Sequence, residues 1–448
     1  MTMTKAQEDL TTGSAVTLEL AGLHTGVSDP RMDSMRLLSE TAFRSPQAIS
    51  FASGRPYEGF FDIAKLHHYL DRFVEHLRER GMPEERIKKA LFQYGPINGL
   101  IRDMITRTLE VDEDIHVAPE AVMVTHGCQE AMMIALRGLF ASPSDVLLTV
   151  SPCYVGIAGA AKMLDIPMAA VPEGTEGIDP EQVATVAREV RESGLRPVAC
   201  YVTPDFSNPS GHSLPIATRH RLLEVAAEQD LLLLEDNPYG LFGRDGAQVP
   251  TLKALDTQHR VIYLGSFAKT VFPGARVGYL VADQEVTGGP GAAKLLAEEL
   301  GKVKSMFTVG TSGISQALVG GVLLDADFSL RTANRELADL YVRHLEVTLS
   351  SLAEHFPPER FAEHGVRWNV PGGGFFLSVE VPFVAGLEAL DRSAREHGVG
   401  WAPMSMFYVG DGGEHIIRLG FSPLTAEEIR EGVRRLAEFI KATPRTDR

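Results

Sequence analysis

The middle of the chain alternates short apolar runs with stretches of helical periodicity. Five runs have the length and composition of strands: "AVMVTHG", "DVLLTVSP", "RPVACYVTP", "LLLLEDNP" and "RVIYLGSF". Stretches such as "CQEAMMIALRGLF" and "IATRHRLLEVAAEQD" lie between them and have the period of helices. Strands that are apolar throughout and separated by helices favour a mostly parallel sheet covered on both faces. The pattern therefore predicts an α/β fold with three layers, α/β/α.

The pattern changes on both sides of this region. The first residues are polar with weak periodicity, and from Ser329 a long helical pattern, "LRTANRELADLYVRHLEVTLSSLAEHF", leads into Gly-rich hairpin chemistry, short strands and a last helix. A chain of 448 residues exceeds one typical core. We therefore expect an N-terminal arm (1–45), a large domain (46–328), whose first part can pack with the C-terminal region, and a smaller α+β domain (329–448).

Chemistry-bearing residues follow the predicted strands. They come after Val124, Val150, Val202, Leu234 and Leu264. In open parallel sheets, ligands bind at the carboxyl ends of the strands. The sequence therefore predicts one active site at this edge of the sheet.

The stretch "YLGSFAKTVFPGARVGYL" places Lys269 just beyond a strand, with Ser266 before it and Arg276 after it. A lone lysine in a loop is usually an exposed, solvated side chain. A hydroxyl and a guanidinium beside it, however, suit a phosphate held next to a reactive amine. We interpret Lys269 as that amine.

Two further strand ends carry polar groups. Asp236 closes a run of four leucines, where a carboxylate is costly unless a cation or strong donor meets it, although "DNP" is also good turn chemistry. In "VTHGCQEAMM", the amides of Gly127, Cys128 and Gln129 open a helix and form a potential anion site. Asn208, in "SNPSG", reads as a turn residue when taken alone.

The composition limits which binding partners and which cellular compartment we expect for this protein. The net charge of -16 and pI near 5.4 make nucleic acid a poor partner. Three cysteines with no paired spacing argue against a disulfide framework or a zinc site, so no metal is expected. No apolar run of about 18 residues indicates a membrane span, and the N-terminus lacks a secretory pattern. We expect a cytoplasmic protein.

Taken together and in order, these motifs resemble those of the class I and II aminotransferases, a family of fold type I pyridoxal-phosphate enzymes. The matching stretches are "QYGPINGLIRD", "NPSG", "EDNPY", "SFAKTVFPGARVGYL" and "IIRLGFS". The resemblance spans roughly residues 50 to 440 and is nearest to the aminoadipate and kynurenine aminotransferase branch. It implies the fold type I architecture, pyridoxal 5'-phosphate as cofactor and a homodimer with shared active sites.

The resemblance also assigns roles to the residues that hold the cofactor. Lys269 would form the internal aldimine and shuttle protons, Asp236 would keep the pyridine nitrogen protonated, and Tyr239 would bond the ring's phenolic oxygen. The remaining cofactor contacts would be Gly127, Cys128, Gln129, Tyr154, Asn208, Ser266, Arg276 and, from the neighbouring subunit, Tyr94.

Substrate contacts follow from the same resemblance. Arg418 would grip the substrate α-carboxylate with a bidentate fork, and Gly54 would close over it. Arg55 departs from the family's usual apolar residue: it either pairs with a surface carboxylate or faces a negatively charged substrate side chain. Cys128 also departs from the usual Ser or Ala; its backbone amide can still serve, and a functional thiol is the alternative.

Three functions compete on these observations. The first is transamination between an α-amino acid and a 2-oxo acid. The second is a non-transaminating enzyme on the same scaffold, such as a lyase, a cyclase, an oxidase or an enzyme that eliminates the γ-substituent of S-adenosylmethionine, because fold and cofactor do not fix the reaction. The third, a DNA-binding regulator, needs a further module ahead of the core, and the roughly 45 residues before "ISFASG" are too few for one. We expect the first.

Overall fold

The computed structural model describes residues 16–33, 47–174, 177–244, 249–289 and 292–446. Its centre is an eight-stranded sheet in the order β2-β9-β8-β7-β6-β3-β4-β5. The strands are β2 (Val122–Thr125), β3 (Asp145–Ser151), β4 (Met168–Gly174), β5 (Gly177–Ile178), β6 (Arg196–Val202), β7 (Leu232–Asp236), β8 (Val261–Ser266) and β9 (Gly278–Val281). The pairs within β4-β3-β6-β7-β8 are parallel, and β9 and β5 run antiparallel to their neighbours. The predicted α/β sheet is confirmed.

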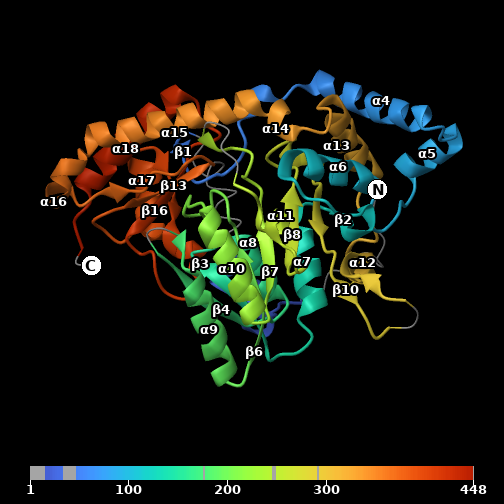
Figure 1. Cartoon of the computed structure of the whole chain (residues 1–448). Helices are drawn as coiled ribbons and strands as arrows, with labels where there is room; N and C mark the ends of the chain where they lie inside the picture. Colours follow the sequence, from blue (N-terminus) through green and yellow to red (C-terminus); the bar gives the residue numbers. More distant parts are fainter. Residues whose placement is uncertain (1–15, 34–46, 175–176, 245–248, 290–291, 447–448) are drawn as a thin grey trace, which may run out of the picture.

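Helices cover both faces of this sheet (Figure 1). Alternate residues of β2 show the division, since Met123 packs with one hydrophobic cluster while Val122 and Val124 pack with another. The first face carries α7 (Cys128–Leu139), α8 (Val155–Met163) and α12 (Leu296–Phe307). The second carries α4 (Ile63–Glu79), α6 (Arg102–Glu113), α9 (Pro180–Glu192), α10 (Ile216–Glu228) and α13 (Gly313–Asp325). Successive side chains of a strand point to opposite faces of the sheet, so helices pack on both faces and the domain has three layers.

The C-terminal elements gather at one end of the molecule, on the left of Figure 1. A four-stranded antiparallel sheet runs in the order β12-β13-β16-β15. Its elements are β12 (Arg367–Trp368), β13 (Phe376–Glu380), β15 (Ala402–Pro403) and β16 (Ile416–Gly420), with α15 (Arg335–His355), α17 (Leu387–Glu396) and α18 (Ala426–Ala442) packed around them. The division of the chain at residue 329 stays a prediction.

A short early segment joins this end of the molecule. β1 (Ile49–Ser50) pairs in parallel with β14 (Val399–Gly400), and Phe51 is fully buried in the C-terminal hydrophobic cluster. The chain then crosses to α4 at the opposite end of the molecule (Figure 1). Residues 51–55 consequently run between the two sheets, next to the carboxyl ends of the large-sheet strands.

One predicted helix is wrong in its extent. The pattern from Ser329 suggests a continuous helix, but the structure has α14 (Leu330–Ala333) followed by α15. At the break, the Asn334 side chain donates to the Leu330 and Thr270 carbonyl oxygens. An asparagine side chain that competes for backbone acceptors disfavours helix continuation. Within the described part of the chain, none of the helices combines the length and apolar character needed to cross a bilayer.

Candidate active site

A pocket of about 270 Å³ lies where the ends of β2, β3, β6, β7 and β8 meet the C-terminal elements. Most of the predicted site residues line it: Gly54, Arg55, Cys128, Gln129, Tyr154, Asn208, Asp236, Tyr239, Ser266, Lys269, Arg276 and Arg418. The topology explains this convergence, because parallel strands deliver their carboxyl ends to one edge.

Lys269 extends from the loop after β8, and its amine is buried in the pocket. Its Nζ donates to the Gly54 carbonyl oxygen at 2.7 Å. Burial lowers the pKa of the amine to about 8, and the nearby charges of Arg418, Arg276 and Arg55 act in the same direction. About a tenth of the amine is therefore neutral, and hence nucleophilic, at pH 7, far more than for an ordinary lysine.

Asp236 ends β7 and is 5% exposed. Its Oδ2 accepts a hydrogen bond from the Tyr201 hydroxyl at 2.5 Å, and its Oδ1 accepts one from the Cys128 thiol at 3.5 Å. Burial raises the pKa of the carboxyl to about 6, against the opposing effects of these two donors and of Lys269. The carboxylate form is thus retained at neutral pH at the floor of the pocket.

An anion cradle lies at the start of α7. Gly127 has φ 75°, a conformation that favours glycine, and a Cβ at this position would overlap the Arg276 guanidinium. The amides of Cys128 and Gln129 belong to the first turn of α7, where no intrahelical acceptor exists. Helix amides, a guanidinium and the Ser266 hydroxyl form the donor set that suits a phosphate group.

Arg418 projects from β16 and is 2% exposed. Its guanidinium lies 4.3 Å from the Phe376 ring centroid and 4.7 Å from that of Phe407. It donates to the Asn208 side-chain oxygen at 2.6 Å and to the Ala52 carbonyl oxygen, while its buried Nε has no protein partner. Burial lowers its pKa to about 10, which still leaves it charged at neutral pH. It can bind a carboxylate in a low-dielectric setting.

Aromatic rings complete the walls. Tyr239 lies against Phe376, with ring centroids 5.6 Å apart and nearly perpendicular planes. The packing of Phe376 also requires glycine at position 54, because a Cβ there would overlap the Phe376 ring. Burial raises the pKa values of the Tyr154 and Tyr239 hydroxyls, so both remain protonated donors.

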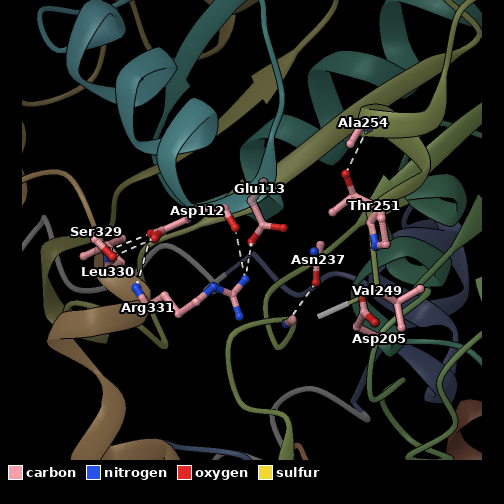
Figure 2. A network of polar contacts seen from close by, with 12 residues as sticks. Asp112, Glu113, Asp205, Asn237, Val249, Thr251, Ala254, Ser329, Leu330 and Arg331 are labelled. Carbon is pink, nitrogen blue, oxygen red and sulfur yellow. Dashed lines mark hydrogen bonds and ion pairs between the residues drawn. The ribbon is translucent and has the colours of Figure 1, made fainter. Parts of the chain in front are cut away.

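Two separate sets of polar contacts lie near the turn that carries Tyr239 (Figure 2). Asn237 accepts a hydrogen bond from the Gly240 amide at 3.0 Å. Nearby, Asp112 accepts hydrogen bonds from Ser329, Leu330 and Arg331 and caps α14, and Arg331 lies 3.9 Å from the buried carboxylate of Glu113. These contacts tie the end of α6 to α14.

Two predicted site residues do not line the pocket. Gly127 lies directly behind it, where it permits the contact with Arg276. Tyr94 is 85% exposed and outside the pocket of this chain, so its predicted contact with a neighbouring subunit's cofactor stays a prediction. Arg55 is exposed at residue level, yet it lines the pocket and its charge contributes to the lowered pKa of Lys269.

The sequence pattern does not identify Tyr201, Phe376 and Phe407 as site residues. Tyr201 lies inside the strand "RPVACYVTP", whereas the site residues predicted for this sheet come at or beyond the strand ends. Phe376 sits in the segment "GGGFF", whose glycines suggested hairpin chemistry alone. The signal for Tyr201 was a polar hydroxyl within an otherwise apolar strand next to the strand of Asp236.

We predict that the Lys269 amine titrates near pH 8 in protein dialysed free of small molecules. Competitive acetylation, read peptide by peptide by mass spectrometry, should show half-maximal reactivity of Lys269 near that pH. Arg55→Gln should move the midpoint upward, because a charge that disfavours the protonated amine is removed. A midpoint near the ordinary lysine value of about 10.4 would contradict the assignment.

Comparisons with known proteins agree with this arrangement. Residues 62–436 match the family model for aminotransferase class I and II. The (S)-3,5-dihydroxyphenylglycine transaminase of Amycolatopsis orientalis is 48% identical over 439 residues, covering 97% of this chain and 98% of that protein. The 2-aminoadipate transaminase of Thermus thermophilus is 32% identical over 401 residues, covering 88% of this chain and 91% of that protein.

Solved structures show the same architecture. Kynurenine aminotransferase of Pyrococcus horikoshii, solved in complex with PMP, has a TM-score of 0.78 at 27% identity and covers 94% of this chain and 97% of its own. The α-aminoadipate aminotransferase LysN of Thermus thermophilus, complexed with N-(5'-phosphopyridoxyl)-L-leucine, has a TM-score of 0.76 at 30% identity, covering 95% and 98%. With the family model matched over most of its length, this chain is an enzyme that belongs to the class I and II aminotransferases.

Proposed function

We propose that this chain is a pyridoxal 5'-phosphate-dependent aminotransferase that moves an amino group between an α-amino acid and a 2-oxo acid. The observation that carries the proposal is the buried Lys269 amine, with its pKa lowered to about 8, in one pocket with Asp236 and Arg418. A reactive amine, a buried carboxylate and a buried guanidinium are the groups such a reaction needs. The named relatives are transaminases, which favours this reaction over the non-transaminating alternatives.

The residues present fit the cofactor. The first turn of α7, Arg276 and Ser266 would hold its phosphate, where a Cβ at Gly127 would fill part of the cradle. Asp236 would meet the ring nitrogen, and Asn208 and Tyr239 would meet the phenolic oxygen. Tyr154 would cover one ring face.

When bound, the cofactor draws electrons away from the α-carbon of an attached amino acid. Lys269 would anchor the cofactor through its amine and then carry a proton between the substrate α-carbon and the cofactor's C4′ atom. Its buried position would keep the amine largely out of water while it moves that proton. Asp236, as a carboxylate, would keep the proton on the ring nitrogen.

Arg418 would fix the substrate α-carboxylate with two parallel hydrogen bonds. The rings of Phe376 and Phe407 restrict the guanidinium, so the carboxylate would be held in a defined plane. That orientation determines which bond of the α-carbon is activated, and Gly54 would leave room above the carboxylate.

For the substrate side chain, we propose an aryl group attached to the α-carbon. The support is the 48% identity, across nearly the whole of both chains, to a transaminase named for (S)-3,5-dihydroxyphenylglycine. Arg55 would lie at the outer end of the pocket, either against polar substituents of the ring or against a surface carboxylate.

We also propose a homodimer in which Tyr94 reaches the partner's cofactor phosphate. The support is a group of exposed apolar side chains near Tyr94, comprising Phe92, Ile97, Met306, Val309 and Ile314. Sedimentation at twice the chain mass of 48.8 kDa would support the dimer, and a monomer at micromolar concentration would contradict it.

A cytoplasmic location, supported by three free cysteines, likewise stays a prediction.

The reaction is tested by nitrogen transfer. Protein loaded with the cofactor and given ¹⁵N-labelled (S)-3,5-dihydroxyphenylglycine should pass the label to an added 2-oxo acid, as read by mass spectrometry. Lys269→Ala should slow the transfer by about 10²- to 10⁴-fold, whereas Lys302→Ala, at an exposed site, should leave it unchanged. Product formed without any 2-oxo acid would favour a non-transaminating enzyme.

Arg418→Ala should raise KM for every α-amino acid by about 10- to 100-fold, because a charge-assisted hydrogen-bond pair is lost. Arg418→Lys keeps the charge without the fork and should give an intermediate KM if the variant folds. Arg395→Ala, at an exposed position on α17, is the matched control. Unchanged KM in both Arg418 variants would exclude this residue from carboxylate binding.

A further inference from the structure

Two side chains from different elements share the Asp236 carboxylate. The Tyr201 hydroxyl donates to Oδ2 at 2.5 Å, and the Cys128 thiol donates to Oδ1 at 3.5 Å. Each oxygen of the carboxylate therefore has its own donor. Such an arrangement fixes the plane of the carboxylate as well as its charge.

Tyr201 lies on β6, beside the strand that carries Asp236. The register pairs Tyr201 with Leu234, two residues before Asp236, and the phenol is 1% exposed. Among the described residues that line the pocket, Thr203 and Asp236 are present and Tyr201 is not. Tyr201 thus stands behind Asp236, away from the pocket wall.

Cys128 faces two ways. Its backbone amide opens α7 at the anion cradle, while its thiol turns to Asp236. Burial and the Asp236 charge raise the pKa of the thiol well above its ordinary value, so the sulfur keeps its proton and acts as a donor. The Cys128 side chain therefore adds a hydrogen bond to Asp236, which the backbone amide of residue 128 alone would not provide.

We propose that Tyr201 and Cys128 are positioning residues that hold Asp236 as an oriented carboxylate, so that it keeps the pyridine nitrogen of the cofactor protonated. The inference rests on the proposed function. It accounts for the hydrogen bond that each carboxylate oxygen accepts from a side chain with no other assigned role, and it leaves acceptor sites on the carboxylate for the ring nitrogen.

A buried aspartate needs hydrogen-bond donors or a nearby cation if it is to stay ionised. Burial favours the neutral carboxylic acid, and it is the largest influence on Asp236. A neutral Asp236 could not stabilise a positive charge on the ring nitrogen. Hydrogen bonds from Tyr201 and Cys128 and the charge of Lys269 all act against burial. The phenol at 2.5 Å is the stronger donor, since a thiol donates weakly and lies farther away.

The test reads the ring nitrogen directly. Wild-type and variant proteins are loaded with pyridoxal 5'-phosphate carrying ¹⁵N in the ring, and the ¹⁵N chemical shift is recorded at pH 7.5. We expect the wild type to give the shift of a protonated pyridine. Tyr201→Phe should move the shift toward that of unprotonated pyridine, and Cys128→Ala should move it less. Cys128→Ser, which restores a donor, should return it toward wild type.

Tyr341→Phe is the matched control. Its hydroxyl is equally buried and accepts from the Tyr57 amide, away from Asp236, so the ring signal should not change. In steady-state kinetics, Tyr201→Phe should lower kcat by about tenfold with little change in KM. In an Asp236→Ala background, Tyr201→Phe should have no further effect, because it acts through Asp236.

An unchanged ¹⁵N shift in Tyr201→Phe would overturn the inference, as would an equal loss of kcat with and without Asp236. Failure of the proposed function has a different signature, in which the wild type does not retain the labelled cofactor at all.

Discussion

A buried carboxylate beside buried cations is the constraint on which the rest of the site depends. Among the described residues lining the pocket, Asp236 is the one acidic side chain, whereas Arg55, Lys269, Arg276 and Arg418 are cationic. Such a pocket carries excess positive charge and favours anions, which suits both a phosphate and an α-carboxylate. Burial, together with the same excess of positive charge, lowers the pKa of Lys269 and makes its amine more reactive.

The two ends of the molecule meet at this pocket through a short backbone segment. Gly420 donates its amide to the Phe51 carbonyl oxygen, Arg418 donates to Ala52, and Lys269 donates to Gly54. A Cβ on Gly420 would overlap the Ser53 carbonyl oxygen, so this approach requires glycine. The predicted substrate-binding residues and the predicted cofactor residues thus come from separate elements, which this backbone segment and the hydrogen bond from Arg418 to Asn208 join.

Much of this organisation could be predicted from the sequence. Uniformly apolar strands such as that ending in Asp236 revealed the parallel sheet, and the rule that ligands collect at carboxyl ends located the pocket. Local patterns could not reveal contacts between distant segments. The hydrogen bond from Tyr201 to Asp236 depends on strand register, and the packing of Phe376 on Gly54 depends on how the two sheets approach. The break at Asn334 depends on a tertiary acceptor, the Thr270 carbonyl.

The central claim is that Lys269 is the residue that anchors the cofactor in this pocket. Borohydride reduction of protein loaded with pyridoxal 5'-phosphate, followed by peptide mass spectrometry, tests it most directly. We expect the phosphopyridoxyl mass on the peptide that contains Lys269 and its loss in Lys269→Ala. Label on another lysine, or a label that persists in Lys269→Ala, would contradict the account.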